Sequence, residues 1–209
     1  MTSSNITPET IDALTELVNI GVGRASNSLN HLLNSHNVLK APKLDVFSTD
    51  EMAEALKTYD EGLLSSVGME FRGDFSGKTF LVFPKESALK LVGTFSGEVE
   101  GSPEMDTVKA GTLLEIGNIV INGVMGSMGN MLKSRILYKL PEYSESNIYQ
   151  LLISQPTFQK EGWILIAKCH FVIEKIDIAG HIMLFFEIES FEPLFSLINR
   201  VIGKEANEL

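Results

Sequence analysis

The sequence lacks several features that would assign it to whole classes of protein. Its 209 residues include a single cysteine, Cys169, which excludes an internal disulfide and a cysteine-rich zinc module. Basic residues are few, because 17 Lys and Arg stand against 27 Asp and Glu and leave a net charge of −10. A chain with this balance has no basic stripe to neutralise phosphates, which argues against nucleic-acid binding.

Long apolar runs are also missing. The longest, such as residues 182–186, are far shorter than the ~18 residues that a membrane span needs, and the first residues lack the basic and apolar pattern of a secretory leader. We therefore expect a cytoplasmic protein without membrane contact. Apolar residues nevertheless make up 44% of the chain, which is enough to bury a substantial core.

A polar pattern occurs twice, each time at the start of an apolar segment rich in small residues. Glu16 and Asn19 of the first copy match Glu115 and Asn118 of the second, 99 positions later (115 − 16 = 99). Pro42 and Pro141 keep this offset. A later segment that starts at Gly77 resembles one that starts at Gly180, 103 positions on (180 − 77 = 103). A period this long indicates duplication of one α/β unit.

Hydrophobic periodicity predicts the same order of elements in both copies. We expect helices over about 8–33, 86–92, 107–132 and 191–202, and strands near 63–71, 78–83, 149–154, 163–174 and 181–188. Residues 93–103 are rich in Gly, Ser and acid, which is typical of a surface connection. The chain is thus predicted to be a single domain, 1–209, built from two repeats of about 7–96 and 106–204.

Helical geometry separates the repeated polar residues from the apolar ones. Asp12, Glu16 and Asn19 fall on one stripe of the first long helix, because residues three and four apart share a face. The predicted buried stripe lies more than about 100° away on the same helical wheel. It contains Ile11, Leu14, Val18, Gly21, Ala25, Leu29 and Leu32.

The second long helix repeats this division, with Glu115 and Asn118 directed outward. Its predicted inward residues are Ala110, Leu114, Gly117, Ile121, Val124 and Met128. Gly111 stands where the first copy has Asp12, so the second copy lacks that carboxylate. Ile20 and Ile119 project beside the glutamates, where an isolated apolar side chain would help a partner protein to dock.

Small residues predict that the two long helices approach each other closely around a pseudo-twofold axis. Gly21, Gly117 and Gly123 would let neighbouring backbones come near. Gly126 and Gly129 have a second interpretation, because glycines near a helix end can also break the helix. The predicted fold class is α+β, with two long helices packed on antiparallel strands.

The pattern Asp/Ser-x3-Glu-x2-Asn-x22-Pro resembles the signature of the CheC, CheX and FliY phosphatases, which dephosphorylate the chemotaxis response regulator CheY. Asp12, Glu16, Asn19 and Pro42 match it in full, and Glu115, Asn118 and Pro141 match it with Gly111 in the first position. The resemblance covers nearly the whole chain. It is nearest to a free-standing, two-site CheC-like protein with an internally duplicated fold.

The resemblance implies a phosphatase that acts on a phosphorylated CheY-like receiver. Asn19 and Asn118 would position the attacking water, and Glu16 and Glu115 would dock on a lysine of the receiver. Asp12 would support Glu16 or contact the partner. The chain would need no cofactor of its own, because the Mg²⁺ ion belongs to the receiver.

A noncatalytic interaction module is the alternative function. The resemblance includes the middle domain of FliM, which lacks the Glu and Asn pair and acts as a scaffold in the flagellar switch. CheC proteins also bind the deamidase CheD, so a CheD-like deamidase is a second expected partner. No metal site is predicted, because Cys169 and His170 are neighbours in a predicted strand and point to opposite faces.

Overall fold

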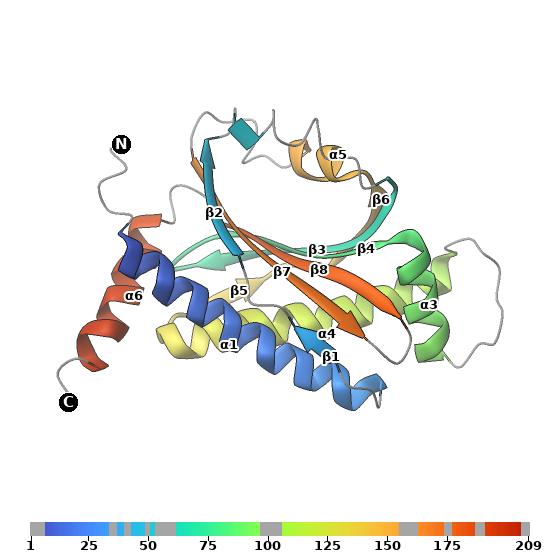
Figure 1. The fold of residues 1–209 in the computed structure, drawn as a ribbon, viewed down its shortest axis with the longest axis horizontal. Helices are drawn as coiled ribbons and strands as arrows, with labels where there is room; N and C mark the ends of the chain where they lie inside the picture. Colours follow the sequence, from blue (N-terminus) through green and yellow to red (C-terminus); the bar gives the residue numbers. More distant parts are fainter. Residues whose placement is uncertain are drawn as a thin grey trace.

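The computed structural model describes residues 7–33, 37–39, 43–48, 51–52, 62–96, 106–154, 163–173, 177–186 and 191–205. Two long helices, α1 and α4, lie side by side across one face of an antiparallel sheet, and a short helix, α5, lies over the other face (Figure 1). The predicted α+β fold class is confirmed.

Both parts of the chain contain a long helix, two short strands, two long strands and a final helix in that order, and the second part also has α5 before its long strands. The helices are α1 (Pro8–Leu33), α3 (Lys85–Ser96), α4 (Thr107–Leu132), α5 (Ile148–Ile153) and α6 (Phe191–Glu205). The strands are β1 (Asn37–Leu39), β2 (Lys43–Ser48), β3 (Leu64–Gly73), β4 (Gly77–Pro84), β5 (Ile136–Tyr138), β6 (Glu142–Ser146), β7 (Trp163–Ile173) and β8 (Ile178–Phe186).

The order of strands in the sheet interleaves the early and the late part of the chain. Among the described residues the order is β1-β7-β8-β4-β3-β5, with β2 also paired to β7 and β6 also paired to β3. The early strands β1 and β2 therefore lie on the late strand β7, while the late strands β5 and β6 lie on the early strand β3. This exchange, centred on the β4 and β8 pair, is the arrangement that a pseudo-twofold axis generates.

Strand registers obey the same symmetry. Asn37 of β1 pairs with Ile173 of β7, and Ile136 of β5 pairs with Gly73 of β3. Asn37 and Ile136 are 99 positions apart (136 − 37 = 99), and Gly73 and Ile173 are 100 apart (173 − 73 = 100). The pairing of β1 with β7 is thus equivalent to the pairing of β5 with β3, with offsets that agree with the sequence period to within one residue.

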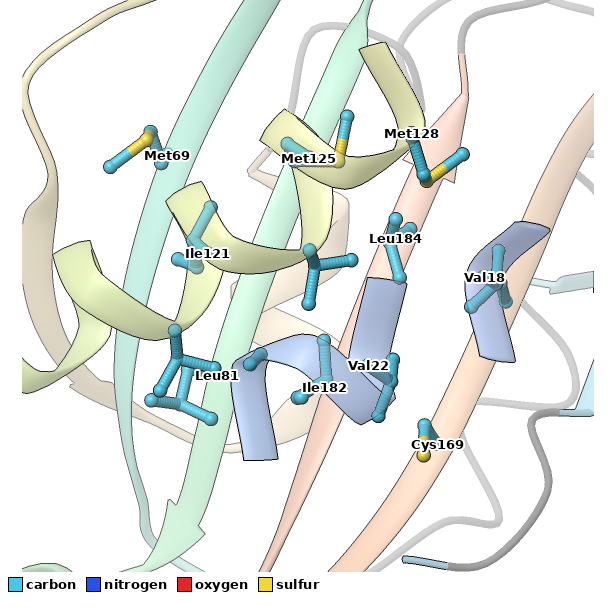
Figure 2. Close-up of a cluster of buried hydrophobic side chains, with 14 of the residues drawn as sticks. Val18, Val22, Met69, Leu81, Ile121, Met125, Met128, Cys169, Ile182 and Leu184 are labelled. Carbon is cyan, nitrogen blue, oxygen red and sulfur yellow. The ribbon is translucent and has the colours of Figure 1, made fainter. Parts of the chain in front are cut away.

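The main core lies between the sheet and the two long helices (Figure 2). Val18 and Val22 of α1 and Ile121 and Met125 of α4 point at the sheet and are at most 1% exposed. The strands contribute Met69, Leu81, Cys169, Ile182 and Leu184 to the same core. Burial on this scale removes each helix face from water and fixes which face remains outside.

A second core lies on the opposite face of the sheet, under α5. Ile148, Leu151 and Leu152 of this helix are at most 5% exposed and pack with Phe80 and Phe185 of the sheet. The rings of Phe80 and Phe185 meet edge to face, with centroids 5.6 Å apart. The sheet is therefore covered by apolar residues on both sides of its centre.

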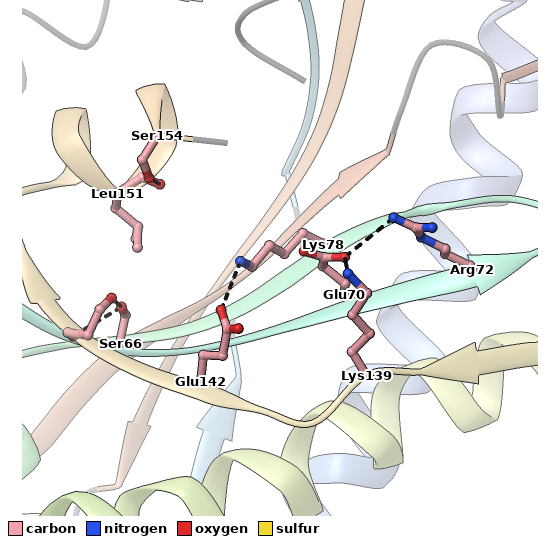
Figure 3. A network of polar contacts seen from close by, with 9 residues as sticks. Ser66, Glu70, Arg72, Lys78, Lys139, Glu142, Leu151 and Ser154 are labelled. Carbon is pink, nitrogen blue, oxygen red and sulfur yellow. Dashed lines mark hydrogen bonds and ion pairs between the residues drawn. The ribbon is translucent and has the colours of Figure 1, made fainter. Parts of the chain in front are cut away.

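Polar contacts tie the β5 and β6 region to the strands β3 and β4 (Figure 3). Lys139 pairs with Glu70 at 2.5 Å, and Lys78 pairs with Glu142 at 3.7 Å. The hydrogen bond from Lys139 is the main cause of the lowered pKa of Glu70. Each ion pair joins a mostly buried side chain of β3 or β4 to an exposed one, and such partly exposed pairs contribute little stability each. They nevertheless connect the early and the late part of the chain.

Several predicted elements are confirmed and one is wrong. Both long helices have the predicted bounds, and the strands and helices predicted near 63–71, 78–83, 86–92, 163–174 and 191–202 are present. The strand predicted near 149–154 is instead helix α5. Asn147 caps this helix by accepting a hydrogen bond from the backbone N–H of Gln150 at 2.8 Å, and its apolar residues repeat at helical spacing.

The long helices bury more of their surface than the predicted stripes. Leu17, Leu113 and Ile116 are buried beside the predicted residues, because each helix packs against both the sheet and the other helix. Ala110 and Leu114 are only half-buried. The side chains of Leu29 and Leu32, together with Pro42, lie outside the described residues.

Two further predictions are corrected at the glycines and at the connection. Helix breaking at Gly126 and Gly129 is wrong, because α4 continues to Leu132. The predicted connection over 93–103 begins later than expected, because α3 continues to Ser96, and residues 97–103 lie outside the described residues. The strand predicted over 181–188 is present to Phe186, and residues 187–188 lie outside the described residues.

None of the helices in the described ranges is both long enough and apolar enough to cross a membrane.

Candidate functional site

The first site consists of Asp12, Glu16, Asn19 and Ile20, on the outer face of α1. The helix begins after Thr7, whose side-chain oxygen accepts a hydrogen bond from the backbone N–H of Thr10 at 3.3 Å. This cap satisfies a backbone N–H of the first turn and sets where the helix begins. With the inner face buried in the core, Asp12, Glu16 and Asn19 are exposed, as predicted.

The surroundings of the first site are open. Ile20 keeps 36% of its surface exposed, so an apolar side chain stands next to the exposed amide of Asn19. Gly23 lies one helical turn after Asn19, and a Cβ built there would meet nothing within 4 Å. The position one turn after Asn19 thus carries no side chain and has room for one.

The second site consists of Glu115, Asn118 and Ile119 on α4. The cap of α4 is Asp106, whose Oδ1 accepts a hydrogen bond from the backbone N–H of Lys109 at 2.9 Å. Asp106 stands 99 positions after Thr7 (106 − 7 = 99), so the caps repeat together with the sites. Both long helices therefore begin at equivalent positions of the repeat.

Exposure differs between the two sites. Glu115 is exposed, as predicted, but Asn118 and Ile119 are half-buried where Asn19 and Ile20 are exposed. Gly111, at the position equivalent to Asp12, faces open space, because a Cβ there would meet nothing within 4 Å. Steric crowding is therefore not the reason why the second site lacks a carboxylate at this position.

A hydrogen bond distinguishes the second site further. The side-chain Nδ2 of Asn122 donates to Oδ1 of Asn118 at 2.7 Å. Asn122 is equivalent to Gly23 in the first copy (122 − 23 = 99). The sequence analysis did not identify Asn122, although its position four residues after Asn118 places both on one helix face.

The two sites lie at opposite sides of the crossing between α1 and α4, which run in opposite directions (Figure 1). The helices meet where a Cβ on Gly123 would lie 3.2 Å from the Cα of Ala25, and Arg24 donates a hydrogen bond to Ser127 at 3.3 Å. At 1.5 Å per residue, Asn19 and Asn118 lie roughly 15 Å apart along the helix axes.

The chemistry available at each site is limited to a carboxylate and a carboxamide. The carboxylate accepts hydrogen bonds and attracts a cation, while the carboxamide both donates and accepts. Within the described ranges no group of three or more His, Cys, Asp or Glu could hold a metal ion. The arrangement is suited to docking a basic group and to orienting a small polar molecule such as water.

Cys169 and His170 take no part in either site. Cys169 is fully buried in the core between the sheet and the long helices. His170 is half-buried, and its Nδ1 lies 3.2 Å from Nε2 of His181 on the paired strand. The two imidazoles form a cross-strand pair between β7 and β8.

No protein-family model matches the sequence. Solved structures resemble it over most of its length. FliY of Thermotoga maritima has a TM-score of 0.75 and 18% identity, with 94% of this chain and 98% of that chain covered. A CheC-like superfamily protein from a Shewanella species has a TM-score of 0.54 and 15% identity, with coverages of 81% and 96%.

FliM is similar as well. FliM in a FliG–FliM complex from H. pylori has a TM-score of 0.63 and 11% identity, with 91% of this chain and 100% of that chain covered. These identities are low, so the similarity establishes the arrangement of the backbone and not a shared activity. The chain has the fold shared by FliY, the CheC-like proteins and FliM.

Proposed function

We propose that the protein is a phosphatase that dephosphorylates a CheY-like response regulator in chemotaxis or a related two-component pathway. The observation that carries this proposal is a Glu and Asn pair, three residues apart, on both α1 and α4, with both members exposed on α1 and the Asn half-buried on α4. Glu16 and Asn19 form the first pair, and Glu115 and Asn118 form the second. The similarity to FliY and a CheC-like protein supports it.

The reaction requires little covalent chemistry from the phosphatase. An aspartyl phosphate hydrolyses when water attacks phosphorus in line with the leaving carboxylate, so that positioning the water supplies much of the rate. Asn19 and Asn118 are the positioning groups. An uncharged carboxamide can accept a hydrogen bond from the water and donate one to a phosphoryl oxygen without repelling the phosphate.

The glutamates provide docking. Glu16 and Glu115 each lie about one helical turn before the amide, so a lysine of the receiver that pairs with the carboxylate brings the phosphoryl group to the amide. Ile20 and Ile119 add apolar contact beside the amide. Asp12 supports docking at the first site. The Mg²⁺ ion that receivers bind would belong to the partner, and the reaction would take place in the cytoplasm.

Phosphate release tests this proposal. Each receiver encoded in the same genome is phosphorylated, and release is measured with and without the wild-type protein. We expect faster release with at least one receiver, and a raised KM with unchanged kcat for the double Glu16→Ala, Glu115→Ala variant. Release at the intrinsic rate with every receiver would contradict the proposal.

A noncatalytic interaction module is the second candidate, favoured by the similarity to FliM in its complex with FliG. In this case the same helices would bind a response regulator or a CheD-like deamidase without turnover. A pull-down with phosphorylated receivers and with such a deamidase separates the two functions. Stable binding without faster phosphate release would support the interaction module.

A further inference from the structure

The second site contains one residue whose chemistry the proposed function does not use. We propose that Asn122 is a positioning residue that fixes the carboxamide of Asn118 for catalysis at the second site. This inference rests on the proposed phosphatase function. The observation that carries it is the 2.7 Å hydrogen bond from Nδ2 of Asn122 to Oδ1 of Asn118.

The hydrogen bond determines how the amide of Asn118 is turned. Asn122 lies four residues later on the same helix face, so Oδ1 of Asn118 is directed toward the C-terminal end of α4. Because the carboxamide is planar, a hydrogen bond that holds Oδ1 also limits where its Nδ2 can point. A carbonyl oxygen has two acceptor positions, so Oδ1 can still accept a hydrogen bond from the attacking water while it accepts the one from Asn122.

The first site has no equivalent restraint. Gly23 stands where the second site has Asn122, and Asn19 is exposed. The amide of Asn19 must therefore lose rotational freedom when it positions water. A side chain already held in one orientation loses less, which is the usual advantage of a catalytic group supported by its neighbours.

The expected effect is on turnover rather than on docking. Glu115 supplies docking, and Asn122 acts in this proposal only through its hydrogen bond to Asn118, so the KM for the receiver should not depend on Asn122. A neutral hydrogen bond of this kind corresponds to a change of about 3- to 10-fold in rate. The same measurement tests the opposite role, in which the hydrogen bond keeps Asn118 away from the receiver. In that case, removing the hydrogen bond would raise kcat.

The first experiment removes the hydrogen-bond donor, Asn122, from a protein in which the first site has been inactivated. In the Asn19→Ala background, Asn122→Ala should lower kcat for phosphate release about 3- to 10-fold with KM unchanged. Asn130→Ala is the matched control, because it makes the same change on an exposed position of α4 two turns further on. An unchanged or increased kcat in the Asn122→Ala variant overturns the proposal.

The second experiment transfers the donor to the first site. In the Asn118→Ala background, Gly23→Asn should raise kcat by a similar factor, because the position is open and a hydrogen bond to Asn19 can form. Gly23→Ala is the control, since it makes the same backbone change without the donor. Equal rates for the Asn and Ala variants contradict the proposal.

A spectroscopic measurement separates this inference from the proposed function. The side-chain amide protons of Asn118 should give two dispersed NMR signals in the wild-type protein, and Asn122→Ala should shift them toward the positions of an exposed amide. Unshifted signals overturn the inference even if the protein is a phosphatase. Wild-type protein that accelerates no receiver contradicts the proposed function, whatever the NMR signals show.

Discussion

Gly21 of α1 lies directly against the backbone of Val124 in α4, so that a Cβ on Gly21 would be 2.9 Å from the carbonyl oxygen of Val124. Contact this close brings the two long helices together over the sheet, with Gly123 lying against Ala25 on the other side of the crossing. The separation and orientation of the two candidate sites follow from this contact.

Gly21→Ala should lower the free energy of unfolding by about 1–3 kcal/mol, because the added methyl group meets backbone that cannot rotate away. Gly23→Ala is the matched control two residues later, where the new Cβ has open space. That variant should be about 1 kcal/mol more stable than the wild type. Urea denaturation measures both, and a Gly21→Ala protein as stable as Gly23→Ala would show that the helices do not meet here.

Cys169 should be an unreactive thiol in the folded protein. Burial raises the pKa of this thiol to about 11 from an ordinary value of 9.0. Because the folded pKa is the higher one, the stability that the neutral thiol contributes is present below pH 9 and is lost as the pH rises toward 11.

Labelling with a thiol reagent at pH 8 checks the burial of Cys169. The native protein should react with the reagent much more slowly than the protein unfolded in urea. A separate measurement of the free energy of unfolding between pH 9 and 11 should show a smaller loss for Cys169→Ala, which has no thiol to ionise. Equally fast labelling of the native and unfolded protein would contradict the buried placement.

Gly111→Asp should strengthen the second site. The change restores the carboxylate that Asp12 provides at the first site, and the position has room for it. Measured in the Asn19→Ala background, we expect a lower KM for the phosphorylated receiver. Gly111→Ala controls for the gain in helix propensity. Equal KM values for the two variants would show that a carboxylate at this position does not contribute to docking of the receiver.

Asp106→Ala should lower the midpoint of thermal unfolding, because α4 loses its cap. Asp106→Asn retains a side-chain acceptor and should be less destabilised. The backbone N–H of Lys109 is the main cause of the lowered pKa of Asp106. The stability that ionised Asp106 contributes is therefore present above its ordinary pKa of 3.8 and is lost as the pH falls through the lowered value. Identical thermal midpoints for the Ala and Asn variants would argue against capping.

The long helices and the exposed pairs were predictable because their signals are local. Glu16 and Asn19 share a helix face by spacing alone, and the spacing recurs in the second copy. The short run that ends at Ser154 was misassigned, because a few apolar residues fit a strand and a buried helix alike. The cap at Asn147 was the signal that distinguished them.

The strands β1, β2, β5 and β6 were not predicted, because what stabilises them lies far away in the sequence. Lys43 of β2 pairs with Lys168 of β7, and Glu142 of β6 pairs with Gly68 of β3. Short polar strands such as β6 carry little alternation of their own. Helix spacing alone could have placed Asn118 and Asn122 on one face. Their hydrogen bond could not be predicted in this way, because it depends on the orientation of the two side-chain amides.

The central claim is that the carboxamides of Asn19 on α1 and Asn118 on α4 position the water that hydrolyses the receiver's aspartyl phosphate. The most direct measurement is phosphate release from a phosphorylated CheY-like receiver with the wild type, Asn19→Ala, Asn118→Ala and the double variant, after circular dichroism has shown that each is folded. We predict that turnover at a site falls about 10²-fold or more when its amide is lost. Acceleration should then disappear only in the double variant. Unchanged turnover in the double variant would contradict the mechanism.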